Sequence, residues 1–413
     1  MAWIDSLFQR MVQTGSSDLH MTSSLVPMFR LDGEMVAVEG CPPITAEQML
    51  NILFEIAPEG NKHEYQKIFD TDFAYELADV GRFRVNLFRD HRGPGGVFRL
   101  IPTKIPSAES LGLPKSVLDL CQLSKGLVLV TGPTGSGKST TLASMIDNVN
   151  TTRSDHVITI EDPIEFVHTP KKCLINQREV RQHTESFKRA LRAALREDPD
   201  IVLVGELRDL ETIEIAIETA ETGHLVFGTL HTTTAHSAVD RIIDQFPAER
   251  QSQVRTMLAS SLRGVVAQTL LKKATGGRVA ALEVLIVNSG IAANIREGKT
   301  HQIPSLMQMN GKIGCKQLND ALFELVLSGA VDANEAYRKC IQKEDFLRKC
   351  QQAQISLALQ DEAATEPLIG GPAQAAMGAP SPRGPLPHAQ APAPTPLAGS
   401  RIPSPGQSAI PRR

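Results

Sequence analysis

The apolar and polar positions of this chain change rhythm at about residue 126. Before that point, an amphipathic start over residues 4–11 is followed by segments that alternate like half-buried strands, and Asp32-Gly33 predicts a tight hairpin. This pattern predicts a small mixed α+β domain over residues 1–100, joined by a linker over residues 101–115 to the rest of the chain.

Two adjoining segments of this domain predict a pair of strands with an arginine-rich face. In residues 82–87, apolar side chains alternate with Arg82, Arg84 and Asn86. A turn is expected at residues 93–96, which read GPGG, before a second strand over residues 97–101. Rows of charge usually face water, so a solvated sheet face is the simplest interpretation.

From residue 126 onward, apolar runs alternate with helical stretches. The runs are GLVLV, HVITI, IVLVG, HLVFGTL and VAALEVLIV, and a helix is expected over residues 210–222. Buried strands that alternate with helices indicate a mostly parallel sheet covered on both faces. We therefore predict an α/β core over residues 116–288 and a helical region over residues 289–359.

Composition changes sharply near the carboxyl end. Residues 360–413 are rich in proline and alanine and contain no aromatic residue, so they cannot bury enough apolar surface to offset chain entropy. We predict a disordered tail there; the alternative is an extended, proline-rich ligand for a groove.

The overall composition excludes several classes of protein. The chain has 413 residues with a net charge of −3, which argues against a protein that coats nucleic acid. Its six cysteines are scattered and contain no CxxC pair, so neither a zinc site nor a disulfide framework has its spacing. No apolar run approaches the roughly 18 residues of a membrane span. We expect a cytoplasmic protein whose membrane contact is peripheral.

The segment GPTGSGKS, directly after the run GLVLV, fits the phosphate-loop pattern G-x-x-x-x-G-K-[ST]. Its glycines allow successive backbone N–H groups to wrap phosphates, and the following helix presents its positive end to them. In this pattern Lys138 reaches the outer phosphates and Ser139 binds Mg²⁺. The expected nucleotide-binding residues are Gly132, Pro133, Thr134, Gly135, Ser136, Gly137, Lys138, Ser139 and Thr140.

Acidic residues follow two of the predicted strands, at the sheet edge where open parallel sheets bind ligands. Glu161 and Asp162, with Glu165 nearby, follow HVITI, and Glu206 follows IVLVG. Because hydrolysis requires groups that hold the metal and align a water, we expect Glu161, Asp162 and Glu206 in the active site. Ser139, Asp162 and Glu206 are the candidate metal ligands. Each acid could instead be a helix cap or surface charge, and Asp162 could simply start a turn.

His224 and His231 bracket the run LVFGTL. A histidine at a strand end could contact a terminal phosphate or a neighbouring acid, but either residue could equally be an ordinary hydrogen-bonded loop residue. No cysteine or third histidine stands at ligand spacing apart from His236, which we interpret as a helix-surface residue, so a histidine metal site is not predicted.

In order and spacing, these motifs resemble the secretion and pilus ATPase superfamily, and within it the type IV pilus retraction ATPases. The stretches that carry the resemblance are ITIEDPIEF, LREDPDIVLVGELRDLET, GHLVFGTLHTT, SSDLHMTSSLVPMFRLDGEM, FPAERQSQVRTMLASSLRGVVAQTLL and IREGKTHQIPSLMQM. The resemblance covers residues 1–350. It implies a PAS-like amino-terminal domain followed by a RecA-like P-loop ATPase domain, assembled as a homohexamer with ATP bound between the two domains.

The resemblance also implies roles for particular residues. Glu206 matches the Walker B glutamate, to which we assign water activation or metal organisation, and Glu161 matches the acidic-box glutamate that supports it. His224 and His231 match the histidine-box pair.

The resemblance also implies a role for two arginines of the amino-terminal domain. Arg84 and Arg99 are most similar to the arginines that the family's amino-terminal domain supplies to nucleotide phosphates. A guanidinium there would stabilise the charge that develops during phosphoryl transfer.

The function implied by the resemblance is a Mg²⁺-dependent ATPase motor that powers pilus retraction and twitching motility at the inner face of the cytoplasmic membrane. Its partner would be an inner-membrane platform protein, and it would work alone or beside a second retraction ATPase. The alternatives are a nucleotide-binding paralogue that modulates another motor, and a pilus extension or secretion ATPase. A nucleic-acid motor is not expected, because no basic stripe with interleaved aromatic residues is present.

Two departures from family patterns bear on the direction of force. Residues 290–297 keep only Ile291, Ile295, Arg296 and Glu297 of the AIRNLIRE-like motif of retraction enzymes, so the resemblance supports ATP hydrolysis more fully than retraction. Extension and secretion ATPases usually carry a larger amino-terminal region and a four-cysteine element, and this chain has neither.

Overall fold

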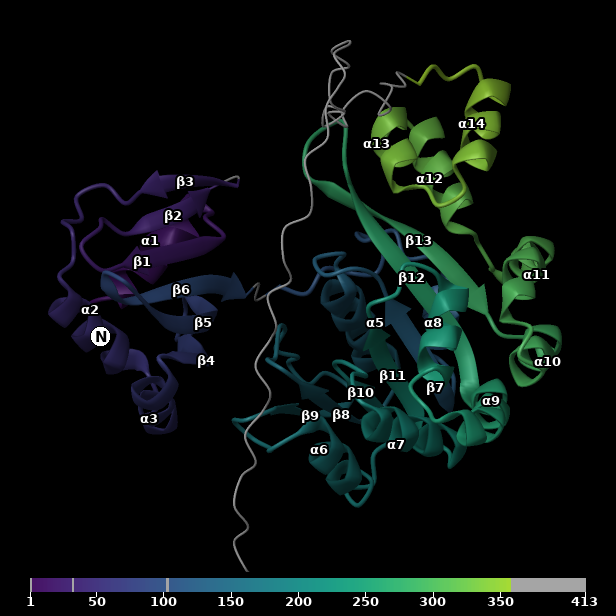
Figure 1. Ribbon diagram of the computed structural model, residues 1–413, viewed down its shortest axis with the longest axis horizontal. Coiled ribbons are helices and arrows are strands. Elements are labelled where there is room, and N and C mark those ends of the chain that lie inside the picture. The colour runs from purple at the N-terminus through teal and green to yellow at the C-terminus, as the bar shows by residue number, and fades with distance from the viewer. Residues whose placement is uncertain (1, 32, 102–103, 358–413) are drawn as a thin grey trace, which may run out of the picture. The chain divides into compact units, whose positions relative to one another are not determined.

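The computed structural model of this chain describes residues 2–31, 33–101 and 104–357 (Figure 1). The predicted disordered tail lies outside the described residues. No helix among the described residues is long and apolar enough to cross a membrane.

An antiparallel six-stranded sheet forms the amino-terminal region, in the order β3-β2-β1-β6-β5-β4. Helix α1 contributes the buried ring of Phe8, which stacks on Phe83 with centroids 4.1 Å apart. The strands on either side of Asp32-Gly33 pair antiparallel, as the expected hairpin requires, although Asp32 itself lies outside the described residues. The elements are α1 (Asp5–Thr14), β1 (Asp18–Thr22), β2 (Met28–Leu31), β3 (Glu34–Ala37), α2 (Ala46–Ile56), α3 (Glu59–Ile68), β4 (Asp70–Leu77), β5 (Gly81–Asp90) and β6 (Gly93–Ile101).

The turn predicted at residues 93–96 is wrong. Strand β6 already begins at Gly93, which pairs with Asp90 of β5, so only two residues connect the strands. Gly95 and Gly96 lie inside the strand, where a Cβ at either position would come within 2.8 Å of a phenylalanine ring. These glycines therefore allow aromatic rings to approach the backbone rather than reversing the chain.

A seven-stranded sheet forms the second region, in the order β13-β12-β7-β11-β10-β8-β9. All neighbouring strands are parallel except β12 and β13, which pair antiparallel as a hairpin, so the mostly parallel sheet is confirmed. The sequence pattern does not predict β9 or β12. The strands are β7 (Gly126–Thr131), β8 (His156–Glu161), β9 (Leu174–Glu179), β10 (Ile201–Val204), β11 (Leu225–Leu230), β12 (Leu262–Lys272) and β13 (Arg278–Ile286).

Helices cover both faces of this sheet, as the apolar runs predict. One face packs against α4 (Lys115–Leu120) and α5 (Lys138–Thr152). The other packs against α6 (Phe187–Ala194), α7 (Leu210–Glu221), α8 (Ala235–Ile243), α9 (Ala248–Ser261), α10 (Ser289–Arg296) and α11 (Ile303–Met309). Four strands of the sheet, β7, β8, β10 and β11, are almost entirely buried, which explains their continuous apolar sequences.

The chain beyond α10 is helical, as predicted. Short 3₁₀ turns, η1 (Thr300–Gln302) and η2 (Gly311–Ile313), flank α11. A separate small core around Leu322 and Phe346 then joins α12 (Leu318–Leu327), α13 (Ala333–Lys339) and α14 (Lys343–Gln352). Figure 1 shows the long β12–β13 hairpin reaching from the sheet to these last helices, and α12 packs on β13.

Candidate active site

The phosphate loop connects the end of β7 to the start of α5. Gly132 and Gly137 have φ values of 148° and 87°, which few other residues adopt. A Cβ on Gly132 would also lie 2.4 Å from the carbonyl oxygen of Gln268, so the loop could not close with a larger residue there. This conformation at the start of a fifteen-residue helix forms a cradle of backbone N–H groups suited to phosphate.

Lys138 lies over this loop. Its Nζ donates to the carbonyl oxygens of Gly132 and Pro133 at 2.9 and 3.2 Å, and lies 3.5 Å from Nδ1 of His231. Desolvation lowers the pKa of Lys138, against the opposing attraction of Glu206 and Glu165. A bound phosphate would give this ammonium the stronger partner that two loop carbonyls do not provide.

Glu206 follows β10 and is surrounded by cationic and imidazole groups. Its Oε2 lies 2.7 Å from the Arg208 guanidinium and its Oε1 lies 3.1 Å from Nε2 of His231. Desolvation would raise the pKa of Glu206, but the hydrogen bond and charge of Arg208, with His231 and Lys138, hold it below its ordinary value. Glu206 is therefore ionised at neutral pH.

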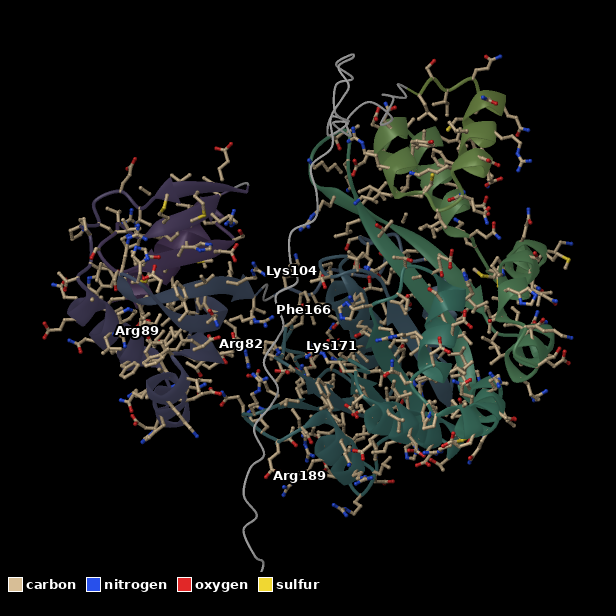
Figure 2. The ribbon with its side chains drawn as sticks, in the orientation of Figure 1. Arg82, Arg89, Lys104, Phe166, Lys171 and Arg189 are labelled. Atoms are coloured by element: carbon tan, nitrogen blue, oxygen red, sulfur yellow. The ribbon has the colours of Figure 1, made fainter. Side chains whose placement is uncertain are left out.

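Glu161 ends the neighbouring strand β8 in different surroundings. Its Oε1 accepts hydrogen bonds from Oγ1 of Thr159 at 2.6 Å and Nε2 of Gln177 at 3.1 Å, both neutral donors. Gln177 also donates to the carbonyl of Phe166, labelled in Figure 2, which fixes the amide in place. Desolvation outweighs these bonds and raises the pKa of Glu161 to about 7.

The residues expected to hold Mg²⁺ fit that ion in chemical type. Ser139 stands in the first turn of α5, and Asp162 and Glu206 leave neighbouring strands at the same sheet edge, so the donors are a hydroxyl and two carboxylates. The described residues include no cluster of three or more histidine, cysteine or acidic side chains that could bind a metal alone. Phosphate-bound Mg²⁺ needs only one or two protein ligands, because phosphates and waters supply the others.

The structure separates the two histidines. His231, at the end of β11, bridges Lys138 and Glu206 as described. His224 precedes β11 at the opposite edge of the parallel sheet, where its Nδ1 contacts the carbonyl of Thr219 at 3.1 Å. Of these two histidines, His231 is therefore the one that lies between Lys138 and Glu206 within one chain.

The two arginines assigned to the nucleotide lie opposite each other on strands β5 and β6. Arg99 donates to Asp18 of its own sheet at 2.7 Å. Arg84 lines a cavity of about 170 Å³ together with Asp162 and Arg208. The structure thus brings Arg84, and not Arg99, next to the predicted acids.

Other acids in the predicted clusters have structural roles. Asp209 caps α7 by accepting from the backbone N–H of Thr212 at 2.8 Å, and Asp200 accepts from the N–H of His156 at 2.9 Å. Asp209 is thus the helix cap that the alternative interpretation allows, whereas Asp200 binds the backbone at the start of β8, 44 residues away along the chain.

Several residues of the site are not among those predicted. Arg82, labelled in Figure 2, donates to the buried Glu179 at 2.9 Å. Gln268 of β12 is buried and donates to the carbonyl of Ser136 in the phosphate loop at 2.6 Å, while its Oε1 has no hydrogen-bond partner among the described residues. The signal available in the sequence was a glutamine inside the apolar run GVVAQTLL, because a polar residue in a buried strand needs a partner.

Comparison with known proteins now identifies the family. The family model described as "Type II/IV secretion system protein" matches residues 1–364. The chain belongs to this family. It is 49% identical over 343 residues to the "Type IV pilus retractation ATPase PilT" of Pseudomonas aeruginosa, covering 83% of this chain and 99% of that protein. It is also 49% identical over 337 residues to the "Twitching motility protein" of Neisseria gonorrhoeae, covering 81% and 89% of the two chains.

Similar solved structures support the same family assignment. The crystal structure of the pilus retraction motor PilT with bound ADP matches with a TM-score of 0.79 and 44% identity, covering 84% of this chain and 99% of that one. The Legionella pneumophila ATPase DotB matches with a TM-score of 0.70 and 25% identity, covering 81% and 94%. The resemblance to pilus retraction ATPases and the predicted fold are confirmed, and the chain is a P-loop ATPase of this family.

Proposed function

We propose that this ATPase is a Mg²⁺-dependent homohexameric motor that powers type IV pilus retraction. The observation that carries the proposal is the contiguous arrangement of Lys138, His231 and Glu206 at the carboxyl edge of the parallel sheet. It joins the group that would grip the outer phosphates to the ionised acid that would organise the attacking water. The names of the similar proteins support retraction as the work done.

Different residues of the protein would have different roles in ATP hydrolysis. The phosphate loop and Lys138 would bind the phosphates, and Ser139, Asp162 and Glu206 would hold Mg²⁺, which neutralises charge on the phosphates. Glu206 would orient the water, with Glu161 as its supporting carboxylate. Arg84 would approach from the amino-terminal domain to stabilise the charge developing on the transferred phosphoryl group.

The motor would act at the inner face of the cytoplasmic membrane, through contact with a membrane-embedded platform protein. Opening and closing of the two domains around the nucleotide would transmit force to this partner. Within α10, Ile291 and Ile295 are fully buried whereas Arg296 ends the helix near the surface. Two of the retained motif positions are thus part of the core, and the surface part of the motif is the one available to a partner.

The second candidate is a nucleotide-binding paralogue that modulates or scaffolds another pilus motor. The chain is 38% identical over 334 residues to the "Type IV pilus ATPase PilU" of Pseudomonas aeruginosa, below its 49% identity to PilT. Both carboxylates, Glu161 and Glu206, are present, which favours an active motor over a nucleotide-binding scaffold.

Phosphate release by the purified protein tests the enzyme. Wild type should hydrolyse ATP with Mg²⁺, and Lys138→Ala should abolish turnover because the phosphates lose their cation. Lys171→Ala is the matched control and should keep wild-type turnover. It removes a lysine that lies outside α5 and forms an ion pair with Asp147 on the surface of that helix. Undiminished hydrolysis by the Lys138 variant would refute the site.

The direction of force is tested in cells. A deletion strain complemented with wild type should retract its pili and twitch, and complementation with Lys138→Ala should leave excess unretracted surface pili. Bald cells in the deletion strain would instead indicate extension. Stimulation of turnover by single-stranded DNA would indicate a nucleic-acid motor.

A further inference from the structure

Glu283 is an ionisable residue in the middle of β13, and the residue is only 7% exposed. Its Oε1 accepts from the backbone N–H of Ala235 at 2.6 Å, and its Oε2 accepts from the N–H of Leu318 at 3.1 Å. These two amides belong to the first residues of α8 and α12. One buried carboxylate thus satisfies the N-termini of two helices that are distant in the sequence.

The first of these helices leads directly to the nucleotide site. Only three residues separate Ala235 from His231, whose Nε2 lies 3.1 Å from Glu206 and whose Nδ1 lies 3.5 Å from Lys138. The last of the three, Thr234, forms a capping box that fixes how the chain enters α8. Holding the N–H of Ala235 therefore holds the far end of the short segment that carries His231.

The second helix opens the carboxyl-terminal helical region. Leu318 packs into the same small core as Phe346 of α14, so the position of α12 is shared by the helices that follow it. Just before α12, the backbones of Lys316 and Val284 exchange two hydrogen bonds of 2.8 Å. Glu283 is therefore held beside a rigid connection between β13 and α12.

We propose that Glu283 is a positioning residue for ATP hydrolysis, which fixes His231 against Glu206 and ties this geometry to the position of α12. The inference rests on the proposed ATPase function. It adds Glu283 to the residues that support hydrolysis, and it adds a connection from α12 through Glu283 to His231. Because Glu283 does not contact the phosphate loop, nucleotide affinity is set elsewhere, and the residue acts on turnover.

Glu283→Gln is the first test. The amide keeps the shape of the side chain but has one accepting oxygen, so one of the two helix amides loses its partner. We expect kcat to fall about tenfold, with KM for ATP and the Kd for ADP within about twofold of wild type. Glu324→Gln, which removes a surface carboxylate of α12 paired with Lys316, is the matched control and should leave kcat unchanged. Wild-type kcat in the Glu283 variant would overturn the proposal.

A double-mutant cycle separates positioning from general destabilisation. If Glu283 acts through His231, Glu283→Gln should lower the residual turnover of a His231→Ala protein by less than about twofold. The same factor in both backgrounds would overturn the proposal. Hydrogen exchange gives a readout that needs no activity: amides of residues 231–236 should exchange faster in Glu283→Gln than in Glu324→Gln, and equal exchange would contradict the inference.

The link to α12 is tested by removing its donor amide. Gln317 has an extended backbone (φ −80°, ψ 154°), as a residue before proline requires, and the first position of a helix accepts proline. Leu318→Pro therefore deletes the backbone N–H. Leu318→Ala also shortens the side chain, but it keeps the backbone N–H. We expect kcat of the proline variant to be about threefold below that of the alanine variant; equal values would overturn the link to α12.

Different results would exclude the ATPase function and the role of Glu283. Wild type and Lys138→Ala with equally absent turnover would remove the proposed ATPase function itself. An active wild type with Glu283→Gln at full turnover would leave that function intact and remove only the role of Glu283.

Discussion

Glu161 and Glu206 are the same residue type at the ends of adjacent strands, yet they lie in opposite surroundings. Glu206 contacts Arg208 and His231, and its pKa is held low. Glu161 receives only neutral donors, and desolvation raises its pKa to about 7. The positions of the two acids at the ends of neighbouring strands place both in the site, whereas the groups around each carboxyl decide which one stays ionised and which one can exchange a proton near neutral pH.

The largest expected effect comes from removing the permanent charge. Glu206→Gln should lower kcat by at least about 10²-fold, because Arg208, His231 and Lys138 would lose the carboxylate that orders them and the water. Phosphate release at saturating ATP measures this. Glu211→Gln, an exposed acid of α7 paired with Lys188, is the control and should stay near wild type. Similar losses in the two variants would show that Glu206 has no special role.

A smaller effect on rate, but a clearer effect on pH dependence, is expected at Glu161. Because its pKa is near 7, its ionised fraction rises between pH 6 and pH 8, and wild-type kcat should rise with it. Glu161→Gln should be about tenfold slower at pH 8 and should lack this rise. A rise of the same size in the variant would assign the titration to another group.

The same substitution should change how stability depends on pH. The pKa of Glu161 is raised above its ordinary value of 4.5, so the folded protein binds more protons than the unfolded chain between about pH 4.5 and 7. Its contribution to stability is therefore full below pH 4.5 and is lost as pH rises to 7. Relative to Glu161→Gln, wild type should lose thermal stability between pH 5 and pH 8, measured as the difference between their melting temperatures.

The smallest change should come from Thr159→Val, which removes the hydroxyl that donates to Glu161 at 2.6 Å. That hydrogen bond favours the ionised carboxylate, so its loss should move the midpoint of the pH–rate profile upward by about half a unit, with kcat above pH 8.5 little changed. A downward shift would contradict the assignment of that profile to Glu161.

Local patterns predicted most of the fold and the centre of the site. The phosphate loop and the acids after HVITI and IVLVG required only short-range sequence, because a buried strand, its loop and the next helix are contiguous. The turn expected at GPGG was wrong because the sequence pattern does not show that the rings of Phe88 and Phe98 pack against the backbone at those glycines. Glycine signals both a turn and a close approach of other groups to the backbone.

What the sequence could not predict depends on contacts between distant elements. The hydrogen bonds from Thr159 and Gln177 oppose the effect of desolvation on the pKa of Glu161. Gln177, however, lies on β9, an edge strand that no apolar run in the sequence predicts. Gln268 and Glu283 were visible only as polar residues inside apolar runs, without their partners. Their partners, Ser136, Ala235 and Leu318, lie between 35 and 132 residues away along the chain.

The glycines of β6 offer a way to loosen one half of the molecule while leaving the other intact. A methyl group at Gly96 would press on Phe98 and Leu53 in the amino-terminal core, far along the chain from the phosphate loop. Such crowding typically costs about 1–3 kcal/mol. Gly96→Ala should accordingly behave as a temperature-sensitive allele, active in the cold and inactive when warmed, with its nucleotide-binding half still folded.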